Sequence, residues 1–249
     1  MYKARLVRTK DARKALVGNV VVPLLRVVAI DGPAGAGKST IAKALAKELR
    51  VPYLDTGAMY RMVTYAALRD RVELSDEKTL GQLARDIEML VEDDTAFVDG
   101  IDVTQVIRGP EVTKAVSVVA AVSTVRNILR EQQREWVVRH NGGVVEGRDI
   151  GTVVFPDATL KVFLTASPLI RAQRRVAEYG GDVEQIAALI DERDRLDSSR
   201  QDSPLREADD SIILDTSDLA INEIVTVLSN KVSERESREL LETNISEPS

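Results

Sequence analysis

The stretch VVAIDGPAGAGKST, residues 27–40, decides the fold of this chain. Its first four residues form a short apolar run that Asp31 and Gly32 end, which is typical of a strand buried on both faces. Residues 32–39 then fit the pattern G-x-x-x-x-G-K-[ST]. From residue 38 onward, apolar residues recur at the spacing of one helical face. A strand, a glycine-rich loop and a helix in this order predict a phosphate-binding loop, or P-loop.

Further apolar strands alternate with helices along the rest of the chain. We expect strands at 51–54, 144–146, 160–164 and 212–214, and helices at 58–68, 75–87, 110–122, 123–140, from 167 and from 221. Such alternation predicts a mostly parallel sheet with helices on both faces. The expected fold class is therefore α/β, with the three-layer α/β/α arrangement of a P-loop NTPase.

Residues 88–104 interrupt this alternation. Short strand-like pieces are separated there by Asp93-Asp94 and Asp99-Gly100, which are typical of turns. We therefore expect a small antiparallel insertion. The boundaries that follow are 26–68 and 110–231 for the core and 69–109 for the insertion.

Both ends of the chain are expected to lie outside the core. The first 25 residues join a basic segment to an apolar one, as a signal peptide does. However, no small-x-small cleavage site follows, and cleavage there would damage the first strand. We expect residues 1–25 to be an N-terminal extension, disordered or poorly ordered. Residues 232–249 carry alternating charges, serines and a late proline, and predict a disordered tail.

Composition excludes several classes of protein. The 34 Lys and Arg against 40 Asp and Glu give a net charge of −6, which disfavours a surface that coats nucleic acid. The absence of cysteine excludes disulfides, thiolate metal sites and a cysteine nucleophile. One histidine, His140, excludes a site of several histidines. No apolar run reaches about 18 residues, so no membrane-spanning helix is expected.

The glycine-rich loop has a chemical reason for its spacing. Gly32, Gly35 and Gly37 let the backbone turn with its N–H groups facing inward, where they and the helix N-terminus can hold phosphates. Lys38 can reach the β and γ oxygens, and Ser39 can ligate Mg²⁺. The motif therefore predicts binding of a nucleoside triphosphate.

Two functional classes share this motif, a regulatory GTPase and a phosphotransferase. The Asn-Lys-x-Asp segment by which GTPases read guanine is absent from the sequence. Arginines instead follow strands or gather in a late helix: Arg61, Arg148, Arg171, Arg174, Arg175, Arg193 and Arg200. Two phosphorylated substrates repel each other and need such neutralisation, which favours phosphoryl transfer to a second anion. For any single arginine, a solvated helix face is the alternative.

Four segments, taken in order, resemble the bacterial cytidylate kinase family: 32–40, 54–61, 146–157 and 192–200. The resemblance runs from about residue 26 to about residue 228, and GRDIGTVVFP is its most specific part. It implies a P-loop kinase fold whose insertion binds the nucleoside monophosphate and whose core includes a short helical lid at about 171–192. It also implies cytoplasmic transfer of the γ-phosphoryl group of ATP to CMP or dCMP with Mg²⁺. We expect a monomer that binds these nucleotides and that binds neither nucleic acid nor a membrane.

The resemblance assigns roles to residues that match the family pattern. It puts ATP on Gly32, Pro33, Ala34, Gly35, Ala36, Gly37, Lys38, Ser39 and Thr40, with Ser39 on the metal. It puts CMP among Thr56, Arg61, Ser117, Arg126, Arg148, Asp149, Arg193, Asp197 and Arg200. The catalytic residues it implies are Lys38, Arg148, Arg193 and Arg200. Ser117 and Arg126 come from the weaker segment 113–129, where a helix-interior serine and a solvated arginine are the alternatives.

Three departures from the family pattern bear on these assignments. The first 25 residues have no counterpart in the family, and the lid is shorter than in longer members. Thr56 stands where some members have serine, which keeps the hydroxyl. Adenylate kinase is disfavoured, because its Asp-Gly-Phe-Pro-Arg segment is absent from the sequence.

Arg193, Asp197 and Arg200 are spaced i, i+4 and i+7, which predicts one face of a helix. That face either looks into the site, with Asp197 on the ribose hydroxyl, or carries only an Arg193–Asp197 surface pair. Asp149 could accept a hydrogen bond from the amine of cytosine. The lid, with Arg171, Arg174 and Arg175, would exclude water.

Four further residues have open or structural interpretations. Asp31 and Asp55 follow strands, and either orient hydrated Mg²⁺ or cap turns. His140 is expected to lie exposed at a helix end. Trp136 is expected in the core rather than as a platform for a base.

Overall fold

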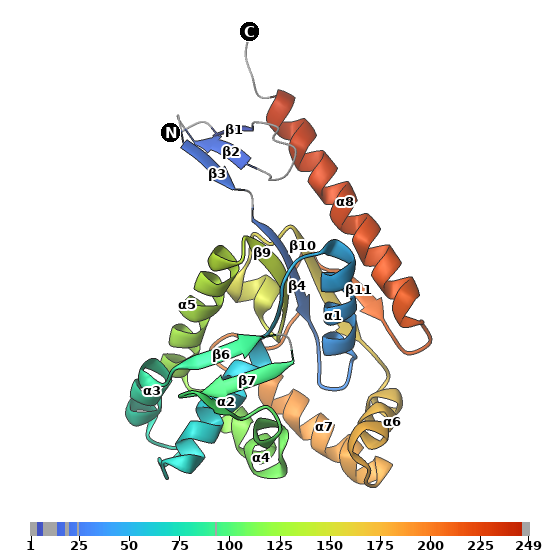
Figure 1. Cartoon of the computed structure of the whole chain (residues 1–249). Coiled ribbons are helices and arrows are strands. Elements are labelled where there is room, and N and C mark those ends of the chain that lie inside the picture. Colours follow the sequence, from blue (N-terminus) through green and yellow to red (C-terminus); the bar gives the residue numbers. More distant parts are fainter. Residues whose placement is uncertain (1–3, 7–13, 18–19, 24, 93, 246–249) are drawn as a thin grey trace.

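A five-stranded sheet forms the centre of the molecule (Figure 1). The computed structural model describes residues 4–6, 14–17, 20–23, 25–92 and 94–245. The strand order is β11-β10-β4-β9-β5, and every neighbouring pair is parallel. The strands are β4 (Arg26–Asp31), β5 (Tyr53–Asp55), β9 (Gly142–Glu146), β10 (Leu160–Thr165) and β11 (Ile212–Asp215). The predicted parallel sheet is confirmed.

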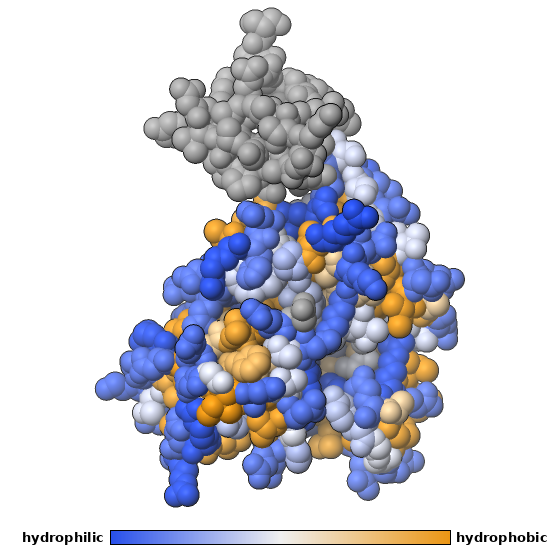
Figure 2. All heavy atoms as spheres, in the orientation of Figure 1, coloured by the Kyte–Doolittle hydropathy of each residue, from blue (hydrophilic) through white to orange (hydrophobic). Residues whose placement is uncertain are grey.

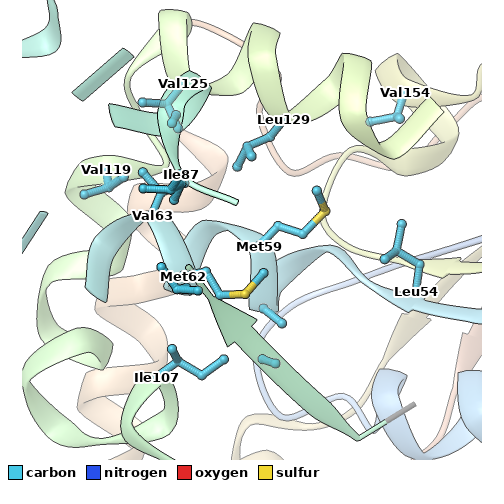
Figure 3. Close-up of a cluster of buried hydrophobic side chains, with 14 of the residues drawn as sticks. Leu54, Met59, Met62, Val63, Ile87, Ile107, Val119, Val125, Leu129 and Val154 are labelled. Carbon is cyan, nitrogen blue, oxygen red and sulfur yellow. The ribbon is translucent and has the colours of Figure 1, made fainter. Parts of the chain in front are cut away.

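Helices cover both faces of this sheet, as the continuous apolar runs of its strands predict. Val28 and Ile30 of β4 pack with α1 (Lys38–Leu49) and α8 (Ile221–Ile245) on one face. Val27 and Ala29 belong to the larger cluster on the other face, with α2 (Thr56–Arg69) and α5 (Ser123–Arg139). Figure 3 shows part of this second cluster. Alternate residues of one strand thus hold the two outer layers to the sheet.

The insertion is a helix and a small antiparallel sheet packed on α2. It contains α3 (Glu77–Asp86), β6 (Met89–Glu92), β7 (Thr95–Val98), β8 (Ile101–Asp102) and the 3₁₀ turn η1 (Val106–Arg108). The pairs β6–β7 and β7–β8 are antiparallel, which confirms the expected insertion. Val98 and Ile107 are fully buried and join the same cluster as Met62 of α2. The chain then returns to the core through α4 (Pro110–Val119).

Two helices follow β10 in the region where a lid is predicted. The first, α6 (Pro168–Tyr179), is capped by Ser167, whose Oγ accepts a hydrogen bond from the Ile170 N–H at 3.3 Å, as expected. The second, α7, spans Val183–Ser198 and so runs beyond the expected lid boundary at about 192. The π-helical turn η2 (Ile150–Val154) lies between β9 and β10 and was not expected from the sequence.

The structure corrects the expectations for both ends of the chain. Within the expected N-terminal extension, β1 (Ala4–Leu6), β2 (Lys14–Val17) and β3 (Val20–Pro23) form an antiparallel sheet. Beyond residue 231, where a disordered tail was expected, α8 continues to Ile245. The reason is visible in the spacing, since Val232 and Glu236 continue the buried face of Ile224 and Leu228. Arg26 Nε donates to Glu236 Oε1 at 2.5 Å.

The surface is mainly hydrophilic on the face in Figure 2, with hydrophobic residues in small groups. Among the described residues, no single helix has the length and apolar composition to cross a membrane. The pair α4 and α5 passes that test only when joined, and it is bent by 100° at the break. Val119, Val125 and Leu129 of this pair are fully buried in the core (Figure 3).

Candidate functional site

The P-loop connects β4 to α1, and its glycines occupy conformations that other residues avoid. Gly32 has φ of 148°, and a Cβ there would lie 2.1 Å from the carbonyl oxygen of Leu164 on β10. Gly37 has φ of 82° and forms the N-cap of α1. A side chain at either position would strain the loop or push it from the sheet. The N-terminus of α1 is thereby left open to a phosphate.

A cleft of about 1530 Å³ opens where the carboxyl ends of the parallel strands meet. Ligands of open α/β sheets bind at this edge. The predicted site residues that line it are Ala34, Gly35, Gly37, Lys38, Ser39, Thr40, Thr56, Arg61, Ser117, Arg126, Arg148, Asp149, Arg193, Asp197 and Arg200. Three predicted ATP residues, Gly32, Pro33 and Ala36, belong to the loop but do not line the cleft.

Three buried cations face one another across the cleft: Lys38, Arg148 and Arg193. Burial and the charge of Arg148 lower the pKa of the Lys38 ammonium well below its ordinary value. Burial and Arg148 likewise lower the pKa of Arg193 to about 9. The Nε of Arg193 is buried and has no hydrogen-bond partner among the described residues. Arg148 has a carboxylate partner, but Lys38 and Arg193 form no ion pair among the described residues. A cation removed from water without a partner is costly, so this arrangement favours a bound anion.

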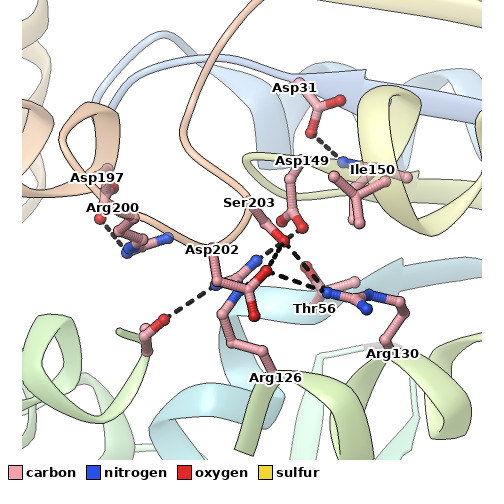
Figure 4. Close-up of polar contacts among 12 residues, drawn as sticks. Asp31, Thr56, Arg126, Arg130, Asp149, Ile150, Asp197, Arg200, Asp202 and Ser203 are labelled. Carbon is pink, nitrogen blue, oxygen red and sulfur yellow. Dashed lines mark hydrogen bonds and ion pairs between the residues drawn. The ribbon is translucent and has the colours of Figure 1, made fainter. Parts of the chain in front are cut away.

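Asp197 of α7 organises the arginines beside this group. Its Oδ2 accepts from Arg148 Nε at 2.8 Å, and its Oδ1 accepts from Arg200 (Figure 4). Burial opposes the charge of Asp197, but Arg148 and Arg200 outweigh it and hold the pKa of the carboxyl below its ordinary value. The alternative of a surface pair between Asp197 and Arg193 is not observed, because Asp197 is only 1% exposed and binds other arginines.

Arg200 does not lie on the helix that the spacing predicts. The last residue of α7 is Ser198, and Ser199 is its C-cap. The chain turns after this point, and Arg200 reaches back to Asp197. Arg193, Asp197 and Arg200 still line one cleft, so the expected convergence holds although its helical explanation does not.

A second charged pair lies deeper in the cleft. Arg126 of α5 is 1% exposed, and its Nη2 donates to Asp149 Oδ2 at 2.6 Å (Figure 4). Its Nη1 donates to the Ala120 carbonyl at 3.0 Å, and its guanidinium lies over the Tyr60 ring. Arg126 is therefore a fixed, buried residue rather than a solvated one. Asp149 faces the cleft beside it.

Three other residues predicted to bind CMP also line the cleft: Thr56, Arg61 and Ser117. Thr56 Oγ1 donates to the Glu146 carbonyl at 2.7 Å, which ties the start of α2 to the end of β9. Arg61 Nη1 donates to the Ile107 carbonyl and to Thr113 Oγ1, both at 2.8 Å. Ser117 of α4 is half-buried and lines the cleft. The insertion and the core thus contribute to one wall.

Glu146, at the end of β9, lines the cleft near Ser39 and was not among the predicted site residues. The Tyr53 hydroxyl donates a hydrogen bond to the Glu146 carboxylate. Burial and the charge of Asp55 raise the pKa of the Glu146 carboxyl. The hydroxyl of Ser39 and the carboxylates of Asp55 and Glu146 are hard oxygen donors, which suits a Mg²⁺ that keeps several waters. No group of three or more His, Cys, Asp or Glu side chains that could hold a metal ion occurs in the described part of the chain.

The two aspartates with open interpretations differ in the structure. Asp31 Oδ1 accepts from the Ile150 N–H at 2.8 Å, and Oδ2 accepts from the Gly151 N–H at 2.7 Å. Asp31 therefore caps the turn η2 and does not line the cleft. Asp55 caps α2 by accepting from the Ala58 N–H, but it also lines the cleft and pairs with Arg108 at 3.3 Å.

The three lid arginines have different surroundings. Arg174 lines the cleft, where it donates to the Thr216 carbonyl at 2.7 Å. Arg175 also lines the cleft and pairs with Glu178 at 3.1 Å. Arg171 differs, since it is buried against the P-loop and does not line the cleft. The three arginines, which were predicted to belong to a lid that excludes water, therefore differ in position, because the helix of Arg171 begins directly beside the loop.

His140 and Trp136 lie where the sequence predicts. His140 is exposed at the C-cap of α5, stacked on Trp136 at 4.2 Å between ring centroids. Trp136 is half-buried and packs against the larger core cluster. Neither residue lines the cleft.

A parallel sheet with a phosphate-binding loop, and buried cations beside that loop, is the arrangement by which P-loop proteins move phosphoryl groups. Fold and site together define a P-loop kinase.

The chain belongs to the cytidylate kinase family, whose sequence model matches residues 28–234. It is 47% identical over 214 residues to a cytidylate kinase of Mycobacterium leprae, covering 84% of this chain and 96% of that protein. It is 49% identical over 208 residues to a cytidylate kinase of Desulforamulus reducens, covering 80% and 93%. It is also 46% identical to a bifunctional pantoate ligase/cytidylate kinase of a Synechococcus species, over 92% of this chain but only 45% of that longer protein.

Proposed function

We propose that this protein transfers the γ-phosphoryl group of ATP to CMP or dCMP, giving ADP and CDP or dCDP. The observation that carries the proposal is the group of buried cations, Lys38, Arg148 and Arg193, between the P-loop and the end of β9. Two phosphates that meet there would neutralise charges that lack sufficient partners. Electrostatic stabilisation of this kind is the main contribution of a protein to phosphoryl transfer.

ATP would bind along the P-loop, on the predicted residues 32–40. Lys38 Nζ donates at present to the Pro33 carbonyl at 2.8 Å, so it lies folded against the loop that would hold the phosphates. From there it can turn to the β and γ oxygens, which would restore its pKa by supplying negative charge. Ser39 would hold Mg²⁺, with Asp55 and Glu146 orienting its waters. When bound, Mg²⁺ neutralises charge on the phosphate oxygens.

CMP would bind on the opposite wall, between the insertion and α7. Asp149, held by Arg126, would accept a hydrogen bond from the exocyclic amine of cytosine. Arg61 and Arg148 would bind the acceptor phosphate, because both have guanidinium groups at the cleft surface. Asp197 would lie near the ribose, held by the arginines that it pairs with.

Arg148, Arg193 and Arg200 would stabilise the transferring phosphoryl group. Their charges converge from two elements, the end of β9 and the region around the end of α7. Negative charge spreads over the equatorial oxygens in the transition state, and fixed cations stabilise it without reorganising. No general base is required in this proposal, because positioning and charge carry most of the barrier reduction.

We further propose that the protein acts in the cytoplasm as a monomer. All residues of the proposed site come from one chain, which supports a site that is complete without a partner. A mass near 27.4 kDa by light scattering in the presence of both substrates would agree with this proposal. A stable dimer would contradict it.

A coupled assay of ADP formation across CMP, dCMP, UMP, AMP and GMP tests the proposed reaction. CMP or dCMP should be the preferred acceptor. Lys38→Ala should reduce turnover by about a thousandfold or more while the far-ultraviolet circular dichroism stays unchanged, because one cation serves both binding and transition state. Lys78→Ala on the exposed surface of α3 is the matched control and should behave as wild type. ATP hydrolysis that no monophosphate stimulates would refute the proposal.

A further inference from the structure

The backbone of Ala34 in the P-loop is held through both its N–H and its carbonyl by side chains of α6 and α7. Arg171 Nη1 donates to the Ala34 carbonyl at 3.0 Å, and the Ala34 N–H donates to Asp194 Oδ1 at 3.0 Å. Arg171 also donates directly to Asp194 Oδ2. The three residues therefore form a closed set of contacts, which we call the Ala34 clamp. Ala34 is 3% exposed and Arg171 is 7% exposed, so water competes little for these bonds.

The clamp joins segments that are far apart in the sequence. Arg171 belongs to the first turn of α6, and Asp194 lies in α7, 160 residues after Ala34. The loop and the helix are also in direct contact, since a Cβ on Gly35 would lie 3.0 Å from Arg171 Cβ and 3.0 Å from its carbonyl oxygen. Ala34, Ala172 and Ile190 form a small buried cluster at the same place. Figure 1 shows α6 and α7 beside the loop between β4 and α1.

The fixed backbone at Ala34 matters because its neighbours in the loop would face the phosphates. The Ala34 N–H is already used by Asp194, so it fixes the loop rather than contacting the nucleotide. Rotation of either peptide unit that flanks Ala34 would turn the amides of the following glycines away from their positions. A binding loop that is fixed beforehand loses less conformational entropy when its ligand binds. The clamp can therefore raise affinity for ATP without touching it.

The same helix also contacts the acceptor side of the cleft. Asp197 lies three residues after Asp194 on α7 and pairs with Arg148 and Arg200. Through Asp194 the helix contacts the P-loop, and through Asp197 it contacts the end of β9. A shift of α7 would therefore disturb both walls of the cleft.

We propose that Arg171 and Asp194 are positioning residues, which hold the backbone of Ala34 so that α6 and α7 set the shape of the ATP phosphate cradle. The inference rests on the proposed function only in taking ATP as the nucleotide that the cradle binds. The carboxylate of Asp194 is needed for both contacts, because one oxygen accepts from the loop and the other binds the arginine.

Asp194→Asn tests the proposal, with Asp191→Asn as the matched control. Asparagine keeps the size of the side chain, but its neutral amide is a weaker hydrogen-bond acceptor for Arg171 than the carboxylate is. Asp191 lies one turn earlier on α7, approaches the same arginine at 3.9 Å and is 66% exposed in its side chain. It takes no part in the Ala34 clamp, so it controls for loss of charge near Arg171.

The dissociation constant of ATP is measured without acceptor, by displacement of a fluorescent ATP analogue, and KM values follow for ATP and CMP. We expect Asp194→Asn to weaken ATP binding about tenfold, the loss typical of a charge-assisted hydrogen bond, with a matching rise in KM for ATP. Asp191→Asn should stay within about twofold of wild type on the same reasoning. KM for CMP at saturating ATP should change less than KM for ATP.

A merely structural role predicts a different result. In that case Asp194→Asn would lower the melting temperature but leave ATP affinity at the wild-type value, and this outcome would overturn the proposal. If Asp194→Asn does not fold, Arg171→Lys replaces it, because lysine keeps the charge but its side chain ends one atom short of Nη1, the atom that donates to both Ala34 and Asp194. Wild-type ATP affinity in folded Arg171→Lys would equally overturn it. Since ATP binding is measured alone, a failure to phosphorylate CMP would refute the proposed function and leave this test intact.

Discussion

A carboxylate accepts hydrogen bonds from an amine and repels a carbonyl oxygen, so Asp149 can separate cytosine from uracil. Asp149→Asn introduces an amide that can donate to O4 of uracil. We expect the ratio of kcat/KM for CMP over UMP to fall by roughly tenfold to a hundredfold, the cost of an unpaired buried polar group. The exposed Asp157→Asn, from the same segment, is the control. An unchanged ratio in Asp149→Asn would show that another residue reads the base.

Asp31 is a buried carboxylate, and burial raises its pKa to about 7 although two backbone N–H groups lower it. Because the folded pKa exceeds the ordinary value of 3.8, folding takes up a proton between these pH values. The stability that Asp31 contributes is therefore complete below about pH 4 and is lost as pH rises through about 7.

Asp31→Asn removes this titration, so it provides the comparison. The unfolding free energy of wild type relative to the variant should fall as pH rises from about 5 to about 7.5, with a slope of at most about 1.4 kcal/mol per pH unit that levels off above pH 7. Urea denaturation at several pH values measures it. Parallel pH profiles for the two proteins would mean that Asp31 keeps an ordinary pKa.

At the scale of elements, α7 brings a buried carboxylate between two arginines. Asp197→Asn leaves Arg148 and Arg200 without their charged partner, and breaking a buried pair of this kind costs about 3–5 kcal/mol. We expect a lower melting temperature and lower kcat on both CMP and dCMP. If Asp197 also binds the ribose, kcat/KM should fall more for CMP, because dCMP lacks the 2′-hydroxyl.

The control for that experiment is Glu192→Gln, an exposed residue of the same helix that pairs only with Arg195 among the described contacts. It should change neither stability nor kinetics. If Asp197→Asn lowers kcat/KM equally for CMP and dCMP, Asp197 holds the two arginines and does not bind the ribose. Wild-type kinetics in Asp197→Asn would remove it from the site.

The last helix gives a second prediction at this scale. Val232 of α8 is 1% exposed and continues the buried face of Leu228, although it lies in the segment expected to be disordered. Val232→Ala should lower the unfolding free energy by about 1–2 kcal/mol through lost burial and cavity formation. Val227→Ala, on the same helix but 44% exposed, should have little effect. Equal stability of both variants would contradict the packing of α8 beyond residue 231.

Charge is distributed unevenly over the whole molecule. The net charge is −6, yet the cleft gathers buried cations. A cationic cleft with low-dielectric walls attracts anionic ligands, and salt screens this attraction. We expect KM for CMP to rise several-fold between about 0.05 M and 0.5 M KCl, with a smaller change in kcat. Binding of uncharged cytidine should depend little on salt, and a KM for CMP that is independent of salt would contradict the prediction.

Much of the architecture could be predicted because local patterns express it directly. The continuous apolar run before Gly32 indicated a strand buried on both faces, and β4 is that strand. The turn residues between 88 and 104 indicated antiparallel pieces, and β6, β7 and β8 are those pieces. The P-loop required only its glycines, its lysine and its flanking elements. Periodicity and turn chemistry depend on neighbours in sequence, which the sequence contains in full.

Other features depend on partners that are distant in sequence. The turn η2 exists because Asp31 accepts two N–H groups about 120 residues away. The sequence does not separate Arg171 from Arg174 and Arg175, but the packing of α6 on the P-loop buries Arg171 while the other two line the cleft. Glu146 belongs to a strand by its pattern, and only the strand order places it beside Ser39. In the sequence, only its position at a strand end, directly before Gly147 and Arg148, could have indicated that Glu146 belongs to the site.

By itself, the sequence determined the parallel sheet, the phosphate-binding loop and the residue types that gather around it, because each follows from a pattern of near neighbours. The tertiary structure alone decided which buried charges pair. Asp197 binds Arg148 and Arg200 rather than Arg193, and Asp194 holds the loop through Ala34. The physical reason is that hydrogen bonds and ion pairs require contact within a few ångströms, and only the packing of helices on the sheet brings these groups together.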